Sequence, residues 1–139
     1  MMNIAFSVPA NADPGLSLEE MKTFVLQHFE DFVNRKISDV ASKNFSDDFL
    51  DHDEPGGAVV GPAAAKTMME HAYEIWPDLH VTVEDILAEG DKVMVRNFWT
   101  ATEKASGKKI QFRGFVLWRF ADRKIVERWA TLTPPQEIL

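Results

Sequence analysis

The sequence predicts an α+β domain in which helices come first and an antiparallel sheet follows. Two observations carry this prediction. Apolar side chains recur at helical spacing in residues 18 to 34, directly after a capping box formed by Ser17 and Glu20. Residues 79 to 133 instead contain four runs rich in Val, Ile, Phe, Trp and Thr, with Gly, Asp or Ser at each break. That second pattern is typical of consecutive hairpins.

Three helices are expected before the sheet. The first extends from the capping box to about Asn34, and a shorter one spans Ser38 to Asn44. The third begins at Pro62, because proline is favoured in a first helical turn, and Pro77 stops it. Residues 1 to 16 are expected to form a flexible tail, and residues 17 to 139 a single domain.

The four strands are expected at residues 79 to 87, 92 to 102, 109 to 120 and 124 to 133. A two-residue turn between the last two places Trp118 opposite Glu127 and Val116 opposite Trp129. The resulting face is mostly aromatic and holds Phe112, Val116, Trp118, Glu127, Trp129 and Thr133.

The other face of this hairpin is also largely apolar. It is expected to carry Phe115, Leu117, Val126, Arg128, Ala130 and Leu132. A sheet that is apolar on both faces needs two covers. The helices supply one cover, so a homodimer packed through the outer sheet face is expected to supply the other.

Composition excludes several classes of partner. The 139 residues carry a formal net charge of −7, which argues against nucleic acid and anionic membranes because both attract clustered Lys and Arg. No apolar run approaches the roughly 18 residues of a membrane span, and the apolar N-terminal patch lacks the basic lead-in of a signal peptide. A cytoplasmic protein is expected. The chain contains no cysteine, which removes disulfides, thiolate metal sites and thiol nucleophiles.

Several spaced motifs point to a family. They are Trp76-Pro-Asp-Leu, Ala88-Glu-Gly-Asp-Lys-Val and Lys124-Ile-Val-Glu-Arg-Trp129, preceded by Phe49-Leu-Asp-His-Asp53 and Gly61-Pro-Ala. Together, over roughly residues 18 to 133, they resemble the SnoaL-like polyketide cyclases. The resemblance implies the α+β cone of the nuclear-transport-factor-like superfamily, in which three N-terminal helices and a curved, mostly antiparallel sheet enclose an internal pocket. Proteins of this fold are usually homodimers packed through the sheet.

The resemblance also implies a type of chemistry. SnoaL-type cyclases use an acidic residue beyond the last-strand Trp to move protons during an intramolecular aldol closure, without a cofactor. Here Trp129 is followed by Ala130, Thr131, Leu132 and Thr133, and a threonine hydroxyl cannot act as a base near neutral pH. Another group must therefore move the proton, with Thr133 left as a hydrogen-bonding remnant.

Two functions follow from this reading. The first is a cofactor-independent cyclase, isomerase or lyase that acts on a polyketide-like or other apolar carbonyl compound. The alternative is a non-catalytic binding protein for a small hydrophobic ligand. The first function requires an acid or base in the pocket, and the second does not.

Three residues are the candidates for proton transfer. His52 lies beside Asp53 in the expected loop after the second helix, and imidazole has an ordinary pKa of about 6.5. The alternative role of His52 is a loop histidine bonded to backbone. Glu127, on the aromatic face, would have a raised pKa because desolvation favours the neutral form. A salt bridge at the pocket rim is the alternative for Glu127.

The expected pocket lining is mainly aromatic. Its members are Phe32, Tyr73, Arg96, Phe98, Phe112, Val116, Trp118, Trp129 and Thr133. Arg96 needs an acidic partner, which is Asp85 after a two-residue turn at Gly90 and Glu84 after a three-residue turn. His28, on the apolar stripe of the first helix, is expected to be a satisfied core histidine. No pair of histidines has ligand spacing with a third donor, so no metal is expected. The resemblance to the cyclases implies that no cofactor is needed.

Overall fold

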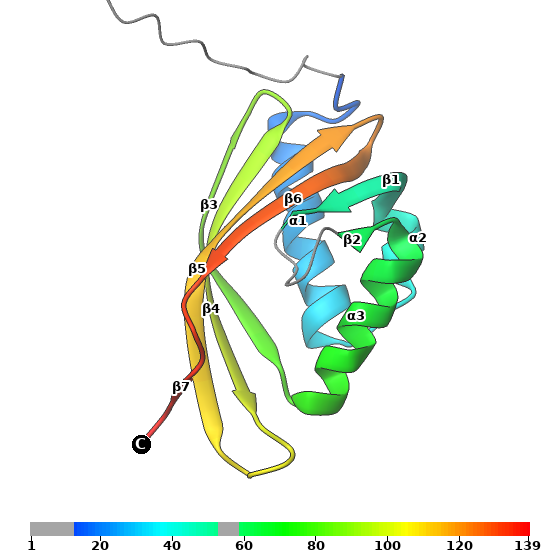
Figure 1. Cartoon of the computed structure of the whole chain (residues 1–139). Helices are drawn as coiled ribbons and strands as arrows, with labels where there is room; N and C mark the ends of the chain where they lie inside the picture. Colours follow the sequence, from blue (N-terminus) through cyan, green and yellow to red (C-terminus); the bar gives the residue numbers. More distant parts are fainter. Residues whose placement is uncertain (1–12, 53–58) are drawn as a thin grey trace, which may run out of the picture.

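The computed structural model describes residues 13–52 and 59–139 (Figure 1). Its helical elements are α1 (Leu18–Phe29), a π-helical turn η1 (Glu30–Asn34), α2 (Val40–Asn44) and α3 (Pro62–Ile75). Its strands are β1 (Phe45–Asp51), β2 (Val59–Val60), β3 (His80–Glu89), β4 (Lys92–Thr102), β5 (Lys109–Ala121), β6 (Lys124–Leu132) and β7 (Gln136–Glu137). The predicted tail lies mostly outside the described residues.

The helices confirm the local predictions. The Ser17 hydroxyl accepts a hydrogen bond from the Glu20 N–H at 3.1 Å, and the Glu20 carboxylate accepts one from the Ser17 N–H at 3.0 Å. This reciprocal capping box satisfies two of the N–H groups that a helix start leaves unpaired. The helix continues to Asn34 as predicted, although its last five residues take the π-helical form. Helix α3 has Pro62 in its first turn, also as predicted.

The sheet confirms the predicted fold class. Its strand order is β2-β1-β6-β5-β4-β3, and β7 pairs with β5 beyond the end of β6. Figure 1 shows that the sheet is curved and that α1, α2 and α3 all lie against its concave face. No helix of the described residues covers the convex face, and none is long and apolar enough to cross a membrane.

Strand β1 was not predicted, because residues 49 to 53 were expected to form a loop. The segment pairs in parallel with β6, and Phe45 and Phe49 point into the core with their rings stacked at a centroid distance of 4.0 Å. The polar run Ser46-Asp47-Asp48 hides this strand in the sequence. Pairing with a strand 77 to 80 residues later, rather than local propensity, defines it.

The predicted register of the last hairpin is wrong beyond its first two pairs. Ala121 faces Lys124 and Phe120 faces Ile125 as predicted, across a turn whose two residues both have positive φ. The register then shifts, so that Glu127 faces Arg119 instead of Trp118. The shift is a β-bulge, in which one extra residue of β6 is inserted between the two registers.

The bulge exchanges the faces of β6, because a shift of one residue turns every side chain to the other side of a sheet. Arg128 and Ala130, expected on the outer face, pair with the inward-facing Trp118 and Val116. Trp129, expected in the pocket, pairs with Leu117 on the convex side. The predicted pocket face is therefore wrong for Glu127 and Trp129, and the predicted outer face is wrong for Arg128, Ala130 and Leu132.

The β3–β4 hairpin has the predicted pairing of Asp85 with Arg96. Arg96 Nε donates to Asp85 at 2.7 Å, and a second guanidinium nitrogen donates to Glu84 at 3.2 Å. Both alternatives for the partner of Arg96 are therefore realised. A bulge between Val83 and Asp85 explains how two consecutive acids reach one arginine.

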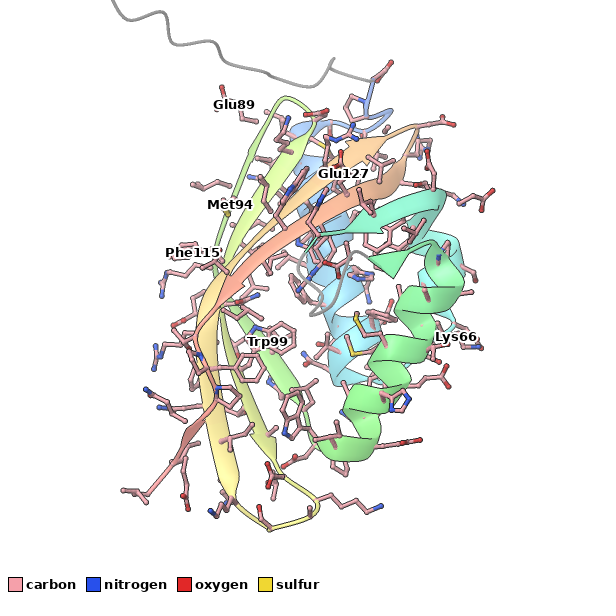
Figure 2. The ribbon with its side chains drawn as sticks, in the orientation of Figure 1. Lys66, Glu89, Met94, Trp99, Phe115 and Glu127 are labelled. Atoms are coloured by element: carbon pink, nitrogen blue, oxygen red, sulfur yellow. The ribbon has the colours of Figure 1, made fainter. Side chains whose placement is uncertain are left out.

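The core fills the space between the concave face and the helices. Figure 2 shows Trp99 projecting into this space, whereas Met94 and Phe115 project from the convex face. Trp99 is 5% exposed and Phe115 is 51% exposed. The two faces of the sheet thus have different environments, and the functional candidates divide between them.

Candidate active site in the concave face

A cavity of about 80 Å³ lies between α1, η1, β1, α3 and the concave face of the sheet. Its walls are mainly aromatic and apolar, and include Phe32, Phe49 and Trp118. Three side chains with ionisable or guanidinium groups also line it: His28, Asp51 and Arg128. Mostly apolar walls with a few polar groups are the usual composition of a small-molecule site.

Asp51 and Arg128 form a buried ion pair at this cavity. Asp51 is the last residue of β1, and its side chain is only 2% exposed. One guanidinium nitrogen of Arg128 donates to both carboxylate oxygens at 3.1 Å. The guanidinium also lies 5.5 Å from the centre of the Trp118 ring. Burying either charge alone would be costly, so each holds the other in place.

His28 occupies the α1 side of the cavity and is 1% exposed. Its Nδ1 lies 2.9 Å from Asn44 Nδ2 at the end of α2. The ring stacks on Phe32 at 5.0 Å and meets Trp118 edge-on at 5.3 Å. Burial, with a smaller contribution from the charge of Arg128, lowers the pKa of His28 from 6.5 to about 3. The imidazole is therefore neutral at physiological pH.

Several buried donors of the concave core have no hydrogen-bond partner among the described residues. They are the indole nitrogens of Trp76, Trp99 and Trp118 and the side-chain amide of Asn97. Trp99 and Trp118 line the cavity. Buried polar groups are nearly always paired in folded proteins, so unpaired ones call for an explanation such as a water or a ligand. The indoles of Trp99 and Trp118 are therefore candidate donors for the oxygen of a bound molecule.

A second cluster forms on the convex face, around two of the predicted catalytic residues. His52 Nε2 lies 2.7 Å from one carboxylate oxygen of Glu127, and Arg119 Nε donates to the other oxygen at 2.7 Å. The His52 ring stacks on Trp129 at 4.8 Å. His52 and Asp51 are adjacent at the end of a strand, so their side chains project from opposite faces.

The expected raised pKa of Glu127 is wrong. Partial burial does favour the neutral acid, but hydrogen bonds and charge from His52 and Arg119 outweigh it and lower the pKa of Glu127. The structure thus contains the alternative, an ion pair, and its partner is Arg119. Asp53 lies outside the described residues. The assignment of proton transfer to His52, Asp53 and Glu127 stays a prediction.

The predicted ligand-binding residues are found in three places. Phe32 and Trp118 line the cavity, and Phe112 and Val116 are buried in the same core, where Phe112 stacks on Trp99 at 5.3 Å. The Tyr73 hydroxyl donates to the Phe32 carbonyl, and burial raises the pKa of Tyr73 to about 12.

The remaining members of that predicted set lie toward the convex side. Arg96 and Thr133 line a hollow of about 360 Å³ together with Phe115. The Thr133 hydroxyl accepts a hydrogen bond from the Arg113 N–H at 3.0 Å, and the Arg113 guanidinium covers the Phe98 ring at 4.5 Å. Ligand binding by these side chains stays a prediction.

Sequence reasoning missed Asp51 and Arg128 and assigned His28 only to the core. Two signals point to Asp51 in retrospect. Phe49 and Asp51 are two residues apart, so an extended segment places them on the same face as the core, with His52 on the other. The bulge that turns Arg128 inward leaves no comparable mark in the sequence. Among the described residues, no group of three His, Asp or Glu side chains is placed to hold a metal ion.

Comparison with known proteins places these observations in a family. The model of the SnoaL-like polyketide cyclases matches residues 23–132. AclR from Streptomyces galilaeus, a provisionally assigned hydroxylase, is similar in structure with a TM-score of 0.73 and 28% identity, over 84% of this chain and 81% of AclR. A provisionally assigned polyketide cyclase from Bacillus cereus is similar with a TM-score of 0.71 and 29% identity, over 95% of this chain and 91% of its own.

A third solved structure is similar in fold alone. TsrD from Streptomyces laurentii has a TM-score of 0.74 at 17% identity, over 84% of this chain and 90% of TsrD. A search of curated proteins found no significant match. The match of the family model extends over most of the sequence and agrees with the helices and the curved sheet. The chain belongs to the SnoaL-like polyketide cyclase family.

Proposed function

We propose that the protein is a cofactor-independent enzyme that moves a proton on a small, apolar carbonyl compound bound in the concave cavity. The observation that carries the proposal is the buried carboxylate of Asp51, which lines an aromatic cavity. A carboxylate in such a place can take a proton from the carbon next to a carbonyl group. Proton removal of this kind is the first half of an aldol closure, isomerisation or elimination.

Arg128 supports this role by fixing the Asp51 carboxylate. One nitrogen contacts both oxygens at equal distances of 3.1 Å, and the guanidinium is itself held over the Trp118 ring. Fixed geometry matters because a base must lie within hydrogen-bond reach of the proton that it removes. In this proposal Asp51 takes the place of the acid that is absent beyond Trp129.

The volume of the cavity limits the size of the ligand. A cavity of about 80 Å³ is well below the roughly 300 to 1,000 Å³ of drug-sized sites. A single ring or a short carbonyl chain therefore fits better than a fused polycyclic compound. Met68 and Met69 of α3 form part of the wall, and unbranched methionine side chains readily adapt to a larger ligand.

The same cavity would also serve the alternative function, a non-catalytic binding protein. The two functions differ in one consequence, because only an enzyme of the proposed kind exchanges the α-hydrogens of its ligand with solvent. Aromatic ketones and β-keto esters, each with a single ring, are suitable probes. Quenching or shift of tryptophan emission would report binding, since Trp99 and Trp118 line the site.

The experiment follows deuterium incorporation into these probes in D₂O by mass spectrometry, with and without the protein. The proposed enzyme accelerates exchange at the α-carbon for at least one probe that also changes the tryptophan emission. Binding without any acceleration would establish the binding protein instead. If no probe changes either emission or melting temperature, the cavity is not a site for this class of ligand.

A further inference from the structure

The donors and acceptors of the cavity are distributed unevenly. Asp51 supplies the carboxylate, whereas the Trp99 and Trp118 indoles and the His28 ring supply nitrogen groups. We infer that His28 is the hydrogen-bond donor that holds the ligand's carbonyl oxygen and the negative charge that this oxygen gains when Asp51 removes the α-proton. The inference rests on the proposed function, and it adds His28 to Asp51 as a second residue that takes part in the proposed reaction.

The contact with Asn44 determines which ring nitrogen of His28 carries the proton. Asn44 Nδ2 is an amide nitrogen and can only donate, so His28 Nδ1, at 2.9 Å, must accept. A neutral imidazole has one proton, which is then on Nε2. Asn44 is 8% exposed, so water does not compete easily for this contact. No described residue accepts a hydrogen bond from Nε2, which leaves this N–H for a ligand.

The surroundings of His28 keep the ring neutral and in one orientation. Phe32 and Phe45 lie at 5.0 Å and Trp118 at 5.3 Å. Deep burial and the nearby charge of Arg128 lower the pKa of His28 to about 3, so the ring does not become an imidazolium that would pair permanently with Asp51. A fixed neutral donor binds an oxygen more strongly as that oxygen becomes negative, and it needs no reorganisation during the reaction.

The two residues therefore define how a ligand lies. Its carbonyl oxygen faces His28 Nε2 and its α-carbon faces Asp51. When the α C–H bond breaks, the proton moves to the carboxylate, its electron pair forms the enolate C=C bond, and the carbonyl electrons move to the oxygen held by His28. Return of the proton from Asp51 to carbon completes an exchange or isomerisation. In an aldol closure the enolate carbon attacks a second carbonyl, and the proton on Asp51 moves to the alkoxide that forms. The ligand class is an enolisable ketone or ester, and phenolates are its stable mimics.

The first test measures the proton on the ring. In ¹⁵N-histidine-labelled protein, two-bond correlations distinguish the two nitrogens. We expect Nε2 of His28 to be protonated and Nδ1 to be unprotonated, without titration between pH 5 and pH 8. A proton on Nδ1, or a ring that becomes doubly protonated in this range, would overturn the inference. This result does not depend on any variant that folds poorly.

The second test uses substituted phenols of graded acidity, with binding followed by tryptophan emission. His28→Phe keeps an aromatic ring but removes the donor, so phenolate affinity should fall about 10- to 100-fold. Affinity should also depend less steeply on the acidity of the phenol in this variant than in the wild type. His28→Gln retains a donor and should lose less. Asp51→Asn should have the opposite effect and tighten phenolate binding, because it removes a like charge.

The outcomes separate this inference from the proposed function. Equal phenolate affinity of wild type and a folded His28→Phe protein overturns the donor role, as does a wild type that binds no phenolate. Loss of deuterium exchange in Asp51→Asn would still support the proposed function in that case. Conversely, unchanged exchange in Asp51→Asn, combined with weak phenolate binding by His28→Phe, would overturn the function and retain the donor.

Discussion

Asp51 and His52 are neighbours in the chain, and their side chains lie on opposite faces of the sheet. Asp51 bonds to Arg128 at the concave cavity, at 3.1 Å, while His52 contacts Glu127 on the convex side at 2.7 Å. Both contacts arise because β1 ends beside β6. There Asp51 pairs with Arg128, and the His52 N–H donates to the Arg128 carbonyl. Under the proposed function, these two residues mark two different places for the chemistry, one on each face of the sheet.

Removing Arg128 should destabilise the fold strongly. In Arg128→Met the Asp51 carboxylate, 2% exposed, loses the guanidinium that bonds to both of its oxygens, and breaking one side of a buried pair costs about 3 to 5 kcal/mol. Urea unfolding at pH 7 measures the change. Arg96→Met is the matched control, because its pair with Asp85 is exposed and such pairs contribute about 0 to 1 kcal/mol.

The double variant Asp51→Asn/Arg128→Met sharpens this prediction. It leaves no buried charge, so it should be more stable than Arg128→Met alone. Equal stability of Arg128→Met and Arg96→Met would show that the Asp51 side chain reaches water, contrary to the structure.

The stability of the protein should depend on His28 in mildly acidic solution. The pKa of His28 is lowered from 6.5 to about 3 by burial, and then by Arg128. Between these values the unfolded chain binds a proton that the folded protein does not, so stability falls as the pH falls. From pH 7 to pH 5 this single group should remove about 2 kcal/mol.

His28→Phe is the appropriate comparison for that measurement. It lacks the titrating ring. Its free energy of unfolding should therefore fall by about 2 kcal/mol less than that of the wild type between pH 7 and pH 5. Other groups titrate in both proteins and cancel in the difference. Parallel pH dependence of the two proteins would mean that His28 titrates normally in the folded state.

The elements of this fold could be predicted where local chemistry defines them. The capping box at Ser17 began α1, and Pro62 and Pro77 bounded α3. The turn at residues 122 and 123 formed with two residues as predicted. Such features depend on side chains a few positions apart, which a sequence displays directly.

The site could not be predicted in the same way. Arg128 reaches the cavity only because a bulge shifts β6 by one residue, and an inserted residue leaves the composition of a strand unchanged. Asp51 reaches it because β1 pairs in parallel with β6, a contact between distant segments. Predicting this site would have required the register between β1, β5 and β6. Patterns of neighbouring residues do not reveal the pairing of strands that are far apart in the sequence.

Gly114 should be needed for the close approach of β5 and β6. An added Cβ would lie 2.0 Å from the Thr131 carbonyl oxygen and 2.9 Å from Leu132 Cα. Gly114→Ala must therefore move backbone, at a cost of about 1 to 3 kcal/mol. The end of β6 should separate first, which amide exchange can detect at Thr133, whose N–H bonds to the Arg113 carbonyl at 2.8 Å.

Gln111→Ala, on the same strand and half-buried, is the control for Gly114→Ala. It should change the stability by only a few tenths of a kcal/mol, about the usual effect of a substitution away from special sites. Unaltered exchange at Thr133 in Gly114→Ala would show that the two strands have more space than the structure gives them.

We propose that a second copy of the chain covers the convex face. Large apolar side chains remain exposed there, namely Leu87, Met94 and Phe115. Phe115→Asp should convert the homodimer to a monomer, because it would bury an unpaired charge in the interface. Sedimentation equilibrium at micromolar concentration measures the mass. Leu26→Asp, an exposed apolar position on α1, should leave the mass unchanged, and a monomeric wild type would contradict the proposal.

The most direct test of the account compares deuterium exchange by Asp51→Asn, His52→Ala and the exposed-site control Asp85→Asn, on a probe that the wild type exchanges. If the concave cavity is the active site, Asp51→Asn should slow exchange about 10²- to 10⁴-fold, the usual contribution of a general base, while its melting curve remains cooperative. Asp85→Asn should retain the wild-type rate. A loss of that size in His52→Ala, with full exchange by Asp51→Asn, would contradict the account and place the chemistry on the convex face.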